Sequence, residues 1–143
     1  MKICMKNLFV AIAVVVASAC GNGQQAKATE NKKDGTEVFY FHGKQQCITC
    51  KKIQALTEEV VKESFAKELK DGKLVFQVID ISTDEGEKLA DQYEVTWASL
   101  FVNKWKDSKE IRNNLTDMAF KNAVSKPEAF KTELKKKIEE MLK

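Results

Sequence analysis

The feature that most constrains this chain is a strand pattern followed closely by two cysteines and a long helical pattern. Residues 38–42 (VFYFH) form a continuous run of β-branched and aromatic side chains, which predicts a strand buried on both faces. From Cys50 onward, apolar side chains recur at steps of three and four residues, which predicts a long amphipathic helix. Cys47 and Cys50 are therefore expected in the turn that joins a buried strand to the start of a helix.

The rest of the chain supplies a regular order of further elements. The expected elements are strands at residues 74–81, 100–102 and 110–112, a short helix after Ser82 or Thr83, and a closing helix that begins near Pro127. Residues 106–109 are turn-prone and predict a hairpin. Ser125 and Glu128 have the spacing of a helix-capping pair. The order β-α-β-α-β-β-α predicts an α/β fold with a four-stranded mixed sheet and helices on both faces.

The amino-terminal segment has the pattern of an export signal. Lys2 and Lys6 precede the apolar run at residues 8–17, and small residues follow, so residues 1–19 are expected to be a signal peptide. Residues 20–36 are polar and predict a flexible tether. The length of 143 residues leaves room for one folded domain, at residues 37–143.

Two cleavage sites compete at the end of this signal. Ala17 and Ala19 fit an ordinary signal-peptidase site, whereas Ser18, Ala19 and Cys20 resemble a lipobox in which Ala17 replaces the usual leucine. Cysteine parity favours the second interpretation, because lipidation of Cys20 leaves Cys47 and Cys50 as an even pair. We therefore expect a lipoprotein of the bacterial cell envelope, anchored to a membrane through Cys20 and facing the periplasm or the exterior.

Composition narrows the class of partner. The chain contains 24 Lys and Arg against 21 Asp and Glu, and the two signs alternate along the sequence without a basic stripe. A nucleic-acid partner is therefore not expected. The sequence also has no flavin or nicotinamide fingerprint, so no cofactor is expected.

The two cysteines predict a redox-active dithiol. A thiol at a helix amino terminus faces unpaired N–H groups and the positive end of the helix dipole, which both favour the thiolate. Lys44, Lys51 and Lys52 add positive charge nearby. The three-residue offset allows a disulfide that closes and reopens by exchange. A purely structural disulfide is the weaker alternative, because so small a loop constrains the unfolded chain very little.

Metal or metalloid binding is a second alternative. Cys47 and Cys50, with His42 five residues before Cys47, could bind a soft ion such as arsenite. A closed structural zinc site would need four ligands, which these residues do not supply. His42 has two further interpretations: a proton acceptor at neutral pH, or a strand-end residue that bonds to the backbone.

The arrangement resembles the thioredoxin superfamily over roughly residues 37–143. The resemblance implies that Cys47 is the exposed nucleophile, that Cys50 is the buried resolving thiol, and that the partner is a protein bound through a mixed disulfide. Two departures are visible: Ser99 stands where that family has a cis-proline, and the first predicted strand, residues 38–42, contains no acidic residue to serve as the buried acid. Trp97 lies in the loop expected to face the disulfide, either as a platform for a partner or as a core residue.

A narrower resemblance rests on two short motifs. Residues 40–43 (YFHG) and the segment from Cys47 to Ile53 resemble the exported thioredoxin-like proteins of the ArsF family, nitrophenyl compound nitroreductase subunit, and residues 114–116 and 127–130 fit the same pattern. This resemblance implies a thiol electron carrier that supports the reduction of nitroaromatic compounds or aromatic arsenicals by another protein.

Overall fold

The computed structural model describes residues 33–143. The predicted signal peptide at residues 1–19, the predicted lipidation site Cys20 and the tether up to residue 32 lie outside the described residues. These features remain predictions.

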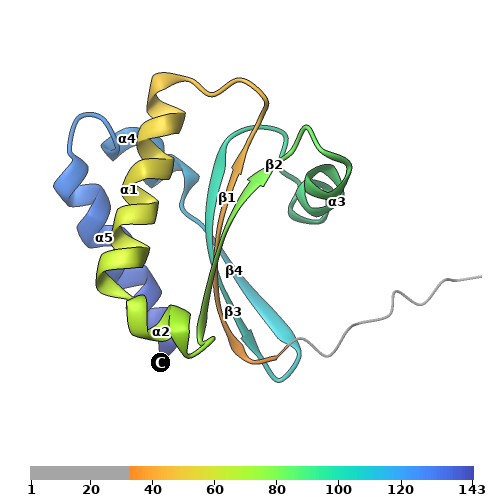
Figure 1. The fold of residues 1–143 in the computed structure, drawn as a ribbon, viewed down its shortest axis with the longest axis vertical. Coiled ribbons are helices and arrows are strands. Elements are labelled where there is room, and N and C mark those ends of the chain that lie inside the picture. Colours follow the sequence, from red (N-terminus) through yellow and green to blue (C-terminus); the bar gives the residue numbers. More distant parts are fainter. Residues whose placement is uncertain (1–32) are drawn as a thin grey trace, which may run out of the picture.

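The sheet has four strands in the order β2-β1-β3-β4 (Figure 1). The strands are β1 (Gly35–His42), β2 (Leu74–Asp80), β3 (Ser99–Lys106) and β4 (Lys109–Asn114). β1 pairs with β2 in parallel and with β3 antiparallel, and β3 pairs with β4 antiparallel. The predicted four-stranded mixed sheet is confirmed.

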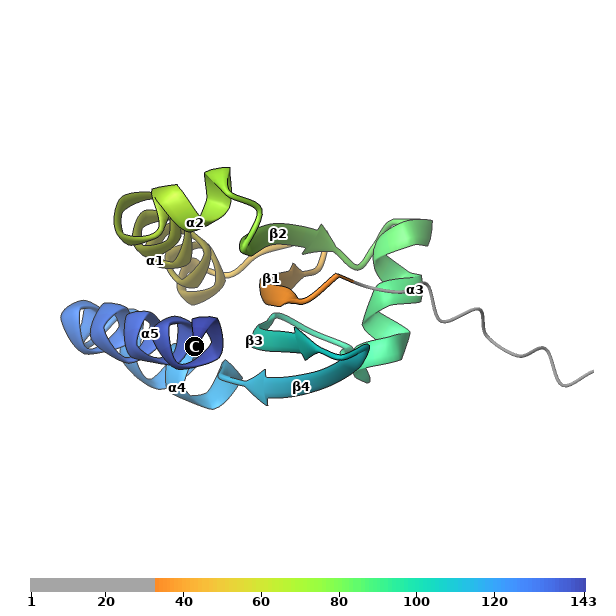
Figure 2. The same ribbon diagram turned by 90° about the horizontal axis from the view of Figure 1, so that it is seen from below.

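Helices cover both faces of this sheet (Figure 2). The helices are α1 (Ile48–Ser64), α2 (Ala66–Lys70), α3 (Asp84–Tyr93), α4 (Thr116–Asn122) and α5 (Pro127–Leu142). α1, α4 and α5 lie on one face, and α3 lies on the other. Apart from the short α2 and α4, the element order is the predicted β-α-β-α-β-β-α, which is the topology that the resemblance to the thioredoxin superfamily implies.

Successive side chains of β1 point to opposite faces of the sheet and so contribute to two apolar layers, one on each face. Val38 and Tyr40 point toward the layer that contains α1 and α5, whereas Phe39 and Phe41 belong to the layer under α3. All four side chains are at most 2% exposed. β1 is therefore the central strand, and its carboxyl end fixes where the loop to α1 begins.

β1 begins earlier than the sequence predicts. Gly35 pairs with Trp105, and the Thr36 N–H donates to the Lys73 carbonyl at 2.9 Å. Because they lack large apolar side chains, Gly35 and Thr36 fall in the predicted tether. This boundary is wrong, because pairing in a sheet uses backbone groups that every residue except proline carries.

Two details of the helices also differ. The long helix predicted from Cys50 is interrupted at Phe65, which has φ −129° and ψ 26° and a buried side chain, so α2 is separate from α1. Pro127 starts α5 as predicted, but the Ser125 cap is wrong. The Ser125 hydroxyl donates to the Lys121 carbonyl at 3.0 Å, and Lys126 occupies the cap position.

The predicted hairpin turn is confirmed. Asp107 and Ser108 connect β3 to β4 with φ values of 51° and 60°. Two consecutive positive φ values are typical of the two-residue turns that match the twist of antiparallel strands.

Within residues 33–143, no helix has the length and apolar composition needed to cross a bilayer.

Candidate functional site

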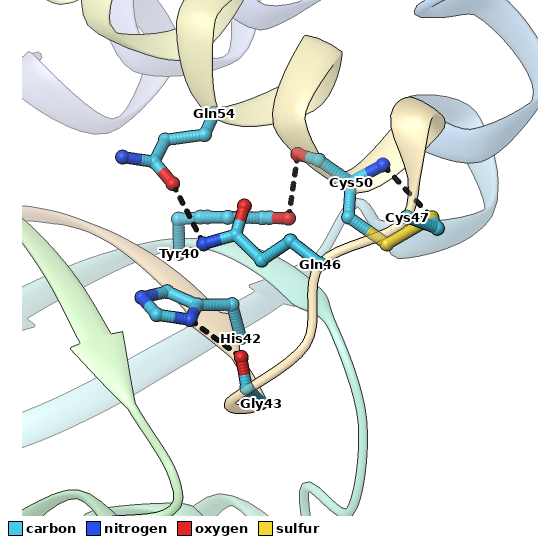
Figure 3. Close-up of a disulfide and its surroundings, with 7 residues drawn as sticks. All are labelled: Tyr40, His42, Gly43, Gln46, Cys47, Cys50 and Gln54. Atoms are coloured by element: carbon cyan, nitrogen blue, oxygen red, sulfur yellow. Dashed lines mark hydrogen bonds between the residues drawn. A yellow bond between two sulfur atoms is a disulfide. The ribbon is translucent and has the colours of Figure 1, made fainter.

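Cys47 and Cys50 are joined by a disulfide at the start of α1 (Figure 3). Their Cα atoms are 5.0 Å apart, which is within the usual range for a bridge. β1 delivers the chain to the edge of the sheet at His42, a short loop follows, and α1 begins at Ile48. The strand and the helix together hold the disulfide in the position predicted from the sequence.

Cys47 is the amino-terminal cap of α1. Its backbone is extended, with φ −68° and ψ 167°, and its sulfur accepts a hydrogen bond from the Cys50 N–H at 3.1 Å. Its carbonyl accepts from the Lys51 N–H at 3.0 Å. The first turn of α1 has no acidic residue. The sulfur thus occupies the place where a helix start best stabilises negative charge, and a thiolate would be stabilised there after reduction.

The two cysteines differ in exposure. Cys47 is exposed, whereas Cys50 is only 9% exposed. Cys50 belongs to the apolar layer that also contains Ile53 and Ala98. A partner molecule can therefore reach the sulfur of Cys47 more readily than that of Cys50.

Tyr40 contacts the first turn of α1 at Cys50, and it is not among the site residues predicted from the sequence. It is fully buried, and its hydroxyl donates to the Cys50 carbonyl at 2.8 Å (Figure 3). Burial raises the pKa of Tyr40 to about 12, so the phenol stays neutral at physiological pH and acts as a donor. A usable signal was present, because a tyrosine in a buried strand needs a partner for its hydroxyl.

His42 is held away from the cysteines. Its Nδ1–H donates to the Gly43 carbonyl at 2.9 Å, and its ring stacks on Tyr40 with centroids 6.2 Å apart. The Tyr40 ring lies between His42 and the first turn of α1 (Figure 3). This is the arrangement of a strand-end histidine bonded to the backbone.

The alternative ligand set of Cys47, Cys50 and His42 is not assembled in the described part of the chain. Residues 33–143 contain no group of three His, Cys, Asp or Glu side chains that could hold a metal ion. The physical reason is the contact of His42 with its own strand end and with Tyr40. Of the three candidate ligands, only the sulfur atoms of Cys47 and Cys50 lie together, so the site offers two soft donors.

A line of polar contacts fixes the loop before Cys47 to α1. The Gln46 amide donates to the Gln54 side-chain oxygen at 3.2 Å, and the Gln54 amide donates to Glu58 at 3.0 Å. Glu58 also accepts from Lys62 at 3.0 Å. The four-residue spacing of the last three residues predicts their contacts on one helix face, whereas the contact of Gln46 depends on the path of the loop.

The loop before β3 carries the other two predicted site residues. Trp97 is 57% exposed, and its ring packs on Phe120 of α4 with centroids 5.1 Å apart. Ser99 is buried, pairs with Phe41 in the sheet, and donates from its hydroxyl to the Trp97 carbonyl at 3.2 Å. Ser99 pairs with Phe41, which places this loop at the carboxyl end of β1, the same end as the disulfide, and Ala98 belongs to the same apolar layer as Cys50.

No protein-family model and no curated protein matches the chain. Among the solved structures that resemble it are a malarial protein and two thioredoxins. The malarial protein has 18% identity and a TM-score of 0.47, with 76% of this chain and 99% of that chain covered. A thioredoxin from Fasciola hepatica has 22% identity and a TM-score of 0.47, with 79% and 84% covered. A thioredoxin from Thermus thermophilus has 19% identity and a TM-score of 0.45, with 71% and 72% covered. At this level of similarity they say nothing about the activity of this chain.

Proposed function

We propose that the chain is a thiol–disulfide oxidoreductase or thiol electron carrier that uses Cys47 and Cys50. The observation that carries the proposal is the position of Cys47, an exposed residue whose sulfur caps α1, beside a buried Cys50. An exposed thiol beside helix N–H groups is suited to attack, and a second thiol one helical turn away is suited to close the disulfide.

The exchange has two balanced steps. In the reduced protein, the Cys47 thiolate attacks one sulfur of a partner disulfide, and the other partner sulfur leaves as a thiolate that takes up a proton. Cys50 then loses its proton and attacks the Cys47 sulfur, which releases the first partner sulfur as a thiolate. The partner gains two electrons, and Cys47 and Cys50 end as the disulfide.

Trapping of the intermediate tests this mechanism. Cys50→Ala leaves the nucleophile without its resolving thiol, so a mixed disulfide with a reducible protein such as insulin is expected to accumulate. Cys47→Ala is the matched control and is expected to trap none. If Cys50→Ala captures no partner and the wild type shows no dithiol couple in glutathione buffers, the proposed function is wrong.

The location in the cell is also a proposal. The export signal, the lipobox-like segment and the even cysteine pair support an envelope protein anchored through Cys20. Labelling with a radioactive fatty acid is expected to modify the wild type but not Cys20→Ser. Equal labelling of both proteins would contradict the anchor.

The narrower family resemblance suggests which reaction the electrons from Cys47 and Cys50 support. The motifs at residues 40–43 and at the cysteines support a carrier that supplies a partner able to reduce nitroaromatic compounds or arsenicals. In cells that lack the protein, reduction of a nitroaromatic compound is expected to slow and to be restored by the wild type but not by Cys47→Ala. Reduction at an unchanged rate would contradict this role.

A further inference from the structure

Three of the six exposed large apolar side chains in residues 33–143 lie at the disulfide end of the molecule. Ile48 is 85% exposed, Val124 is 58% exposed and Trp97 is 57% exposed. Figure 1 shows that the connection between α4 and α5, which carries Val124, lies at the same end as the start of α1. Exposed apolar groups that cluster in this way are typical of surfaces that bind a partner.

Ile48 and Val124 line one shallow hollow beside the redox pair. Ala55 and the side chains of Lys51 and Lys52 complete its lining. Lysine combines an apolar stem with a charged end, so this hollow offers apolar contact together with two positive charges. Both lysines are exposed, and neither has an ion pair within residues 33–143.

Trp97 extends the same surface. Its ring packs on Phe120 of α4, and Phe120 lies four residues before Val124. α4 ends at Asn122, and the Ala123 N–H still donates to the Ala119 carbonyl at 2.9 Å, so Val124 directly follows the helix that carries Phe120. We call Ile48, Lys51, Lys52, Val124 and Trp97 the docking face.

The charge on the docking face is of one sign. Its two charged members are lysines, and the first turn of α1 has no acidic residue. Glu94 and Asp117 line a different hollow, which shares only Trp97 with the docking face. A segment that covers Ile48 and Val124 therefore meets positive charge on the side of α1.

We propose that the docking face selects partner segments in which the reactive cysteine is flanked by an apolar residue and by acidic side chains. This inference rests on the proposed thiol-exchange function and adds the class of partner. The apolar flank would cover Ile48 and Val124, and the carboxylates would lie over Lys51 and Lys52. Complementary charge of this kind acts mainly on the rate of encounter and on the choice of partner.

Two model peptides test the selection. Each carries a leucine beside a single cysteine that is bonded to thionitrobenzoate, and the flanks contain either two glutamates or two lysines. Attack by the Cys47 thiolate on the peptide sulfur releases thionitrobenzoate, which is measured by absorbance. At low ionic strength the acidic peptide is expected to react at least about tenfold faster, and added salt is expected to reduce the ratio.

Charge reversal supplies the decisive variant. The double change Lys51→Glu and Lys52→Glu also alters the reactivity of Cys47, but the ratio between the two peptides cancels that effect because one thiolate attacks both. The ratio is expected to invert. The matched control is Lys67→Glu with Lys70→Glu, which removes the same charge from the exposed surface of α2 and is expected to keep the ratio.

Val124→Ser tests the apolar part. It is expected to slow the reaction with both peptides by the same factor. The reaction with hydroxyethyl disulfide, which has no flanking residues, is expected to keep its rate. Equal rates for the two peptides, or a ratio that survives the reversal at Lys51 and Lys52, would overturn the inference. Release of no thionitrobenzoate from either peptide, and no reaction with hydroxyethyl disulfide, would contradict thiol exchange itself and the inference with it.

Discussion

Tyr40 links the central strand to the redox pair through one hydrogen bond. The hydroxyl donates to the Cys50 carbonyl, and the Cys50 N–H donates to the sulfur of Cys47. The side chain is fully buried, and the raised pKa keeps the phenol in its donating form. Tyr40 is therefore a positioning residue that holds the first turn of α1 where its N–H group meets the sulfur.

Tyr40→Phe tests this role. The change is expected to lower the free energy of unfolding by about 1 kcal/mol, because one buried hydrogen bond is lost. It is also expected to raise the pKa of the Cys47 thiol in the reduced protein, because the first turn is held less firmly. Denaturant unfolding measures the first effect, and the pH dependence of alkylation measures the second.

Tyr93→Phe is the matched control. Tyr93 is also buried, and its hydroxyl donates to Glu110 and accepts from Asn103, but it lies in the layer under α3. Loss of the Tyr93 hydroxyl is expected to lower the free energy of unfolding without changing the pH dependence of Cys47 alkylation. If Tyr40→Phe behaves like this control, Tyr40 has only a structural role.

Buried tyrosines also predict a loss of stability at high pH. Burial raises the pKa of Tyr40 to about 12, and burial with the Glu110 hydrogen bond raises the pKa of Tyr93 as well. The folded protein then holds phenolic protons that the unfolded chain releases near pH 10, so stability falls as pH rises from about 10 to 12. Unfolding at several pH values should show this fall, with a smaller slope in Tyr40→Phe. An unchanged slope would contradict the assignment.

At the scale of elements, the cap of α1 explains the local geometry of the site. The sulfur of Cys47 accepts a hydrogen bond from the Cys50 N–H, which would otherwise lack a partner at the helix start. Serine can supply the same acceptor, whereas alanine cannot.

Cys47→Ser and Cys47→Ala therefore form an informative pair. Both remove the disulfide, so the comparison isolates the cap. Under reducing conditions Cys47→Ser is expected to be more stable than Cys47→Ala by about 1 kcal/mol, measured by denaturant unfolding. Equal stability would show that the side chain at position 47 does not stabilise α1.

Elements with strong local signals were predictable. The buried run in β1, the apolar stripe of α1 and the turn at Asp107 and Ser108 each depend on neighbours in the sequence. The added pairing of Gly35 and Thr36 depends on backbone groups of distant strands, which carry no side-chain signal. The break at Phe65 places an aromatic ring in the core, and such packing overrides helical periodicity.

In the site, too, the features that depend on neighbours in the sequence were predictable, and those that depend on distant packing were not. The placement of Cys47 and Cys50 follows from local spacing, and the disulfide is where the sequence predicts it. The contact of Tyr40 with the Cys50 carbonyl and the stacking of His42 on Tyr40 depend on how the strand packs against the helix. Alternation along β1 places both side chains on one face, but it does not say which of them reaches the helix.

At the scale of the whole molecule, the disulfide and the start of the described chain lie at opposite ends of β1 (Figure 1). The chain enters the sheet at Gly35, and the redox pair follows His42. Eight residues of strand span about 26 Å at roughly 3.3 Å per residue. An anchor at Cys20, as we propose, would therefore enter at the end of the domain far from the site and leave the docking face open to partners.

The pH dependence of alkylation in the reduced protein, followed residue by residue by mass spectrometry, tests directly whether the start of α1 makes Cys47 the reactive thiolate. Cys47 is expected to react first, with a midpoint below the value of about 8.5 for a free cysteine, and Cys50 is expected to be protected. A Cys47 midpoint at or above that value, or equal reaction of the two thiols, would contradict the claim that the start of α1 makes Cys47 the reactive thiolate.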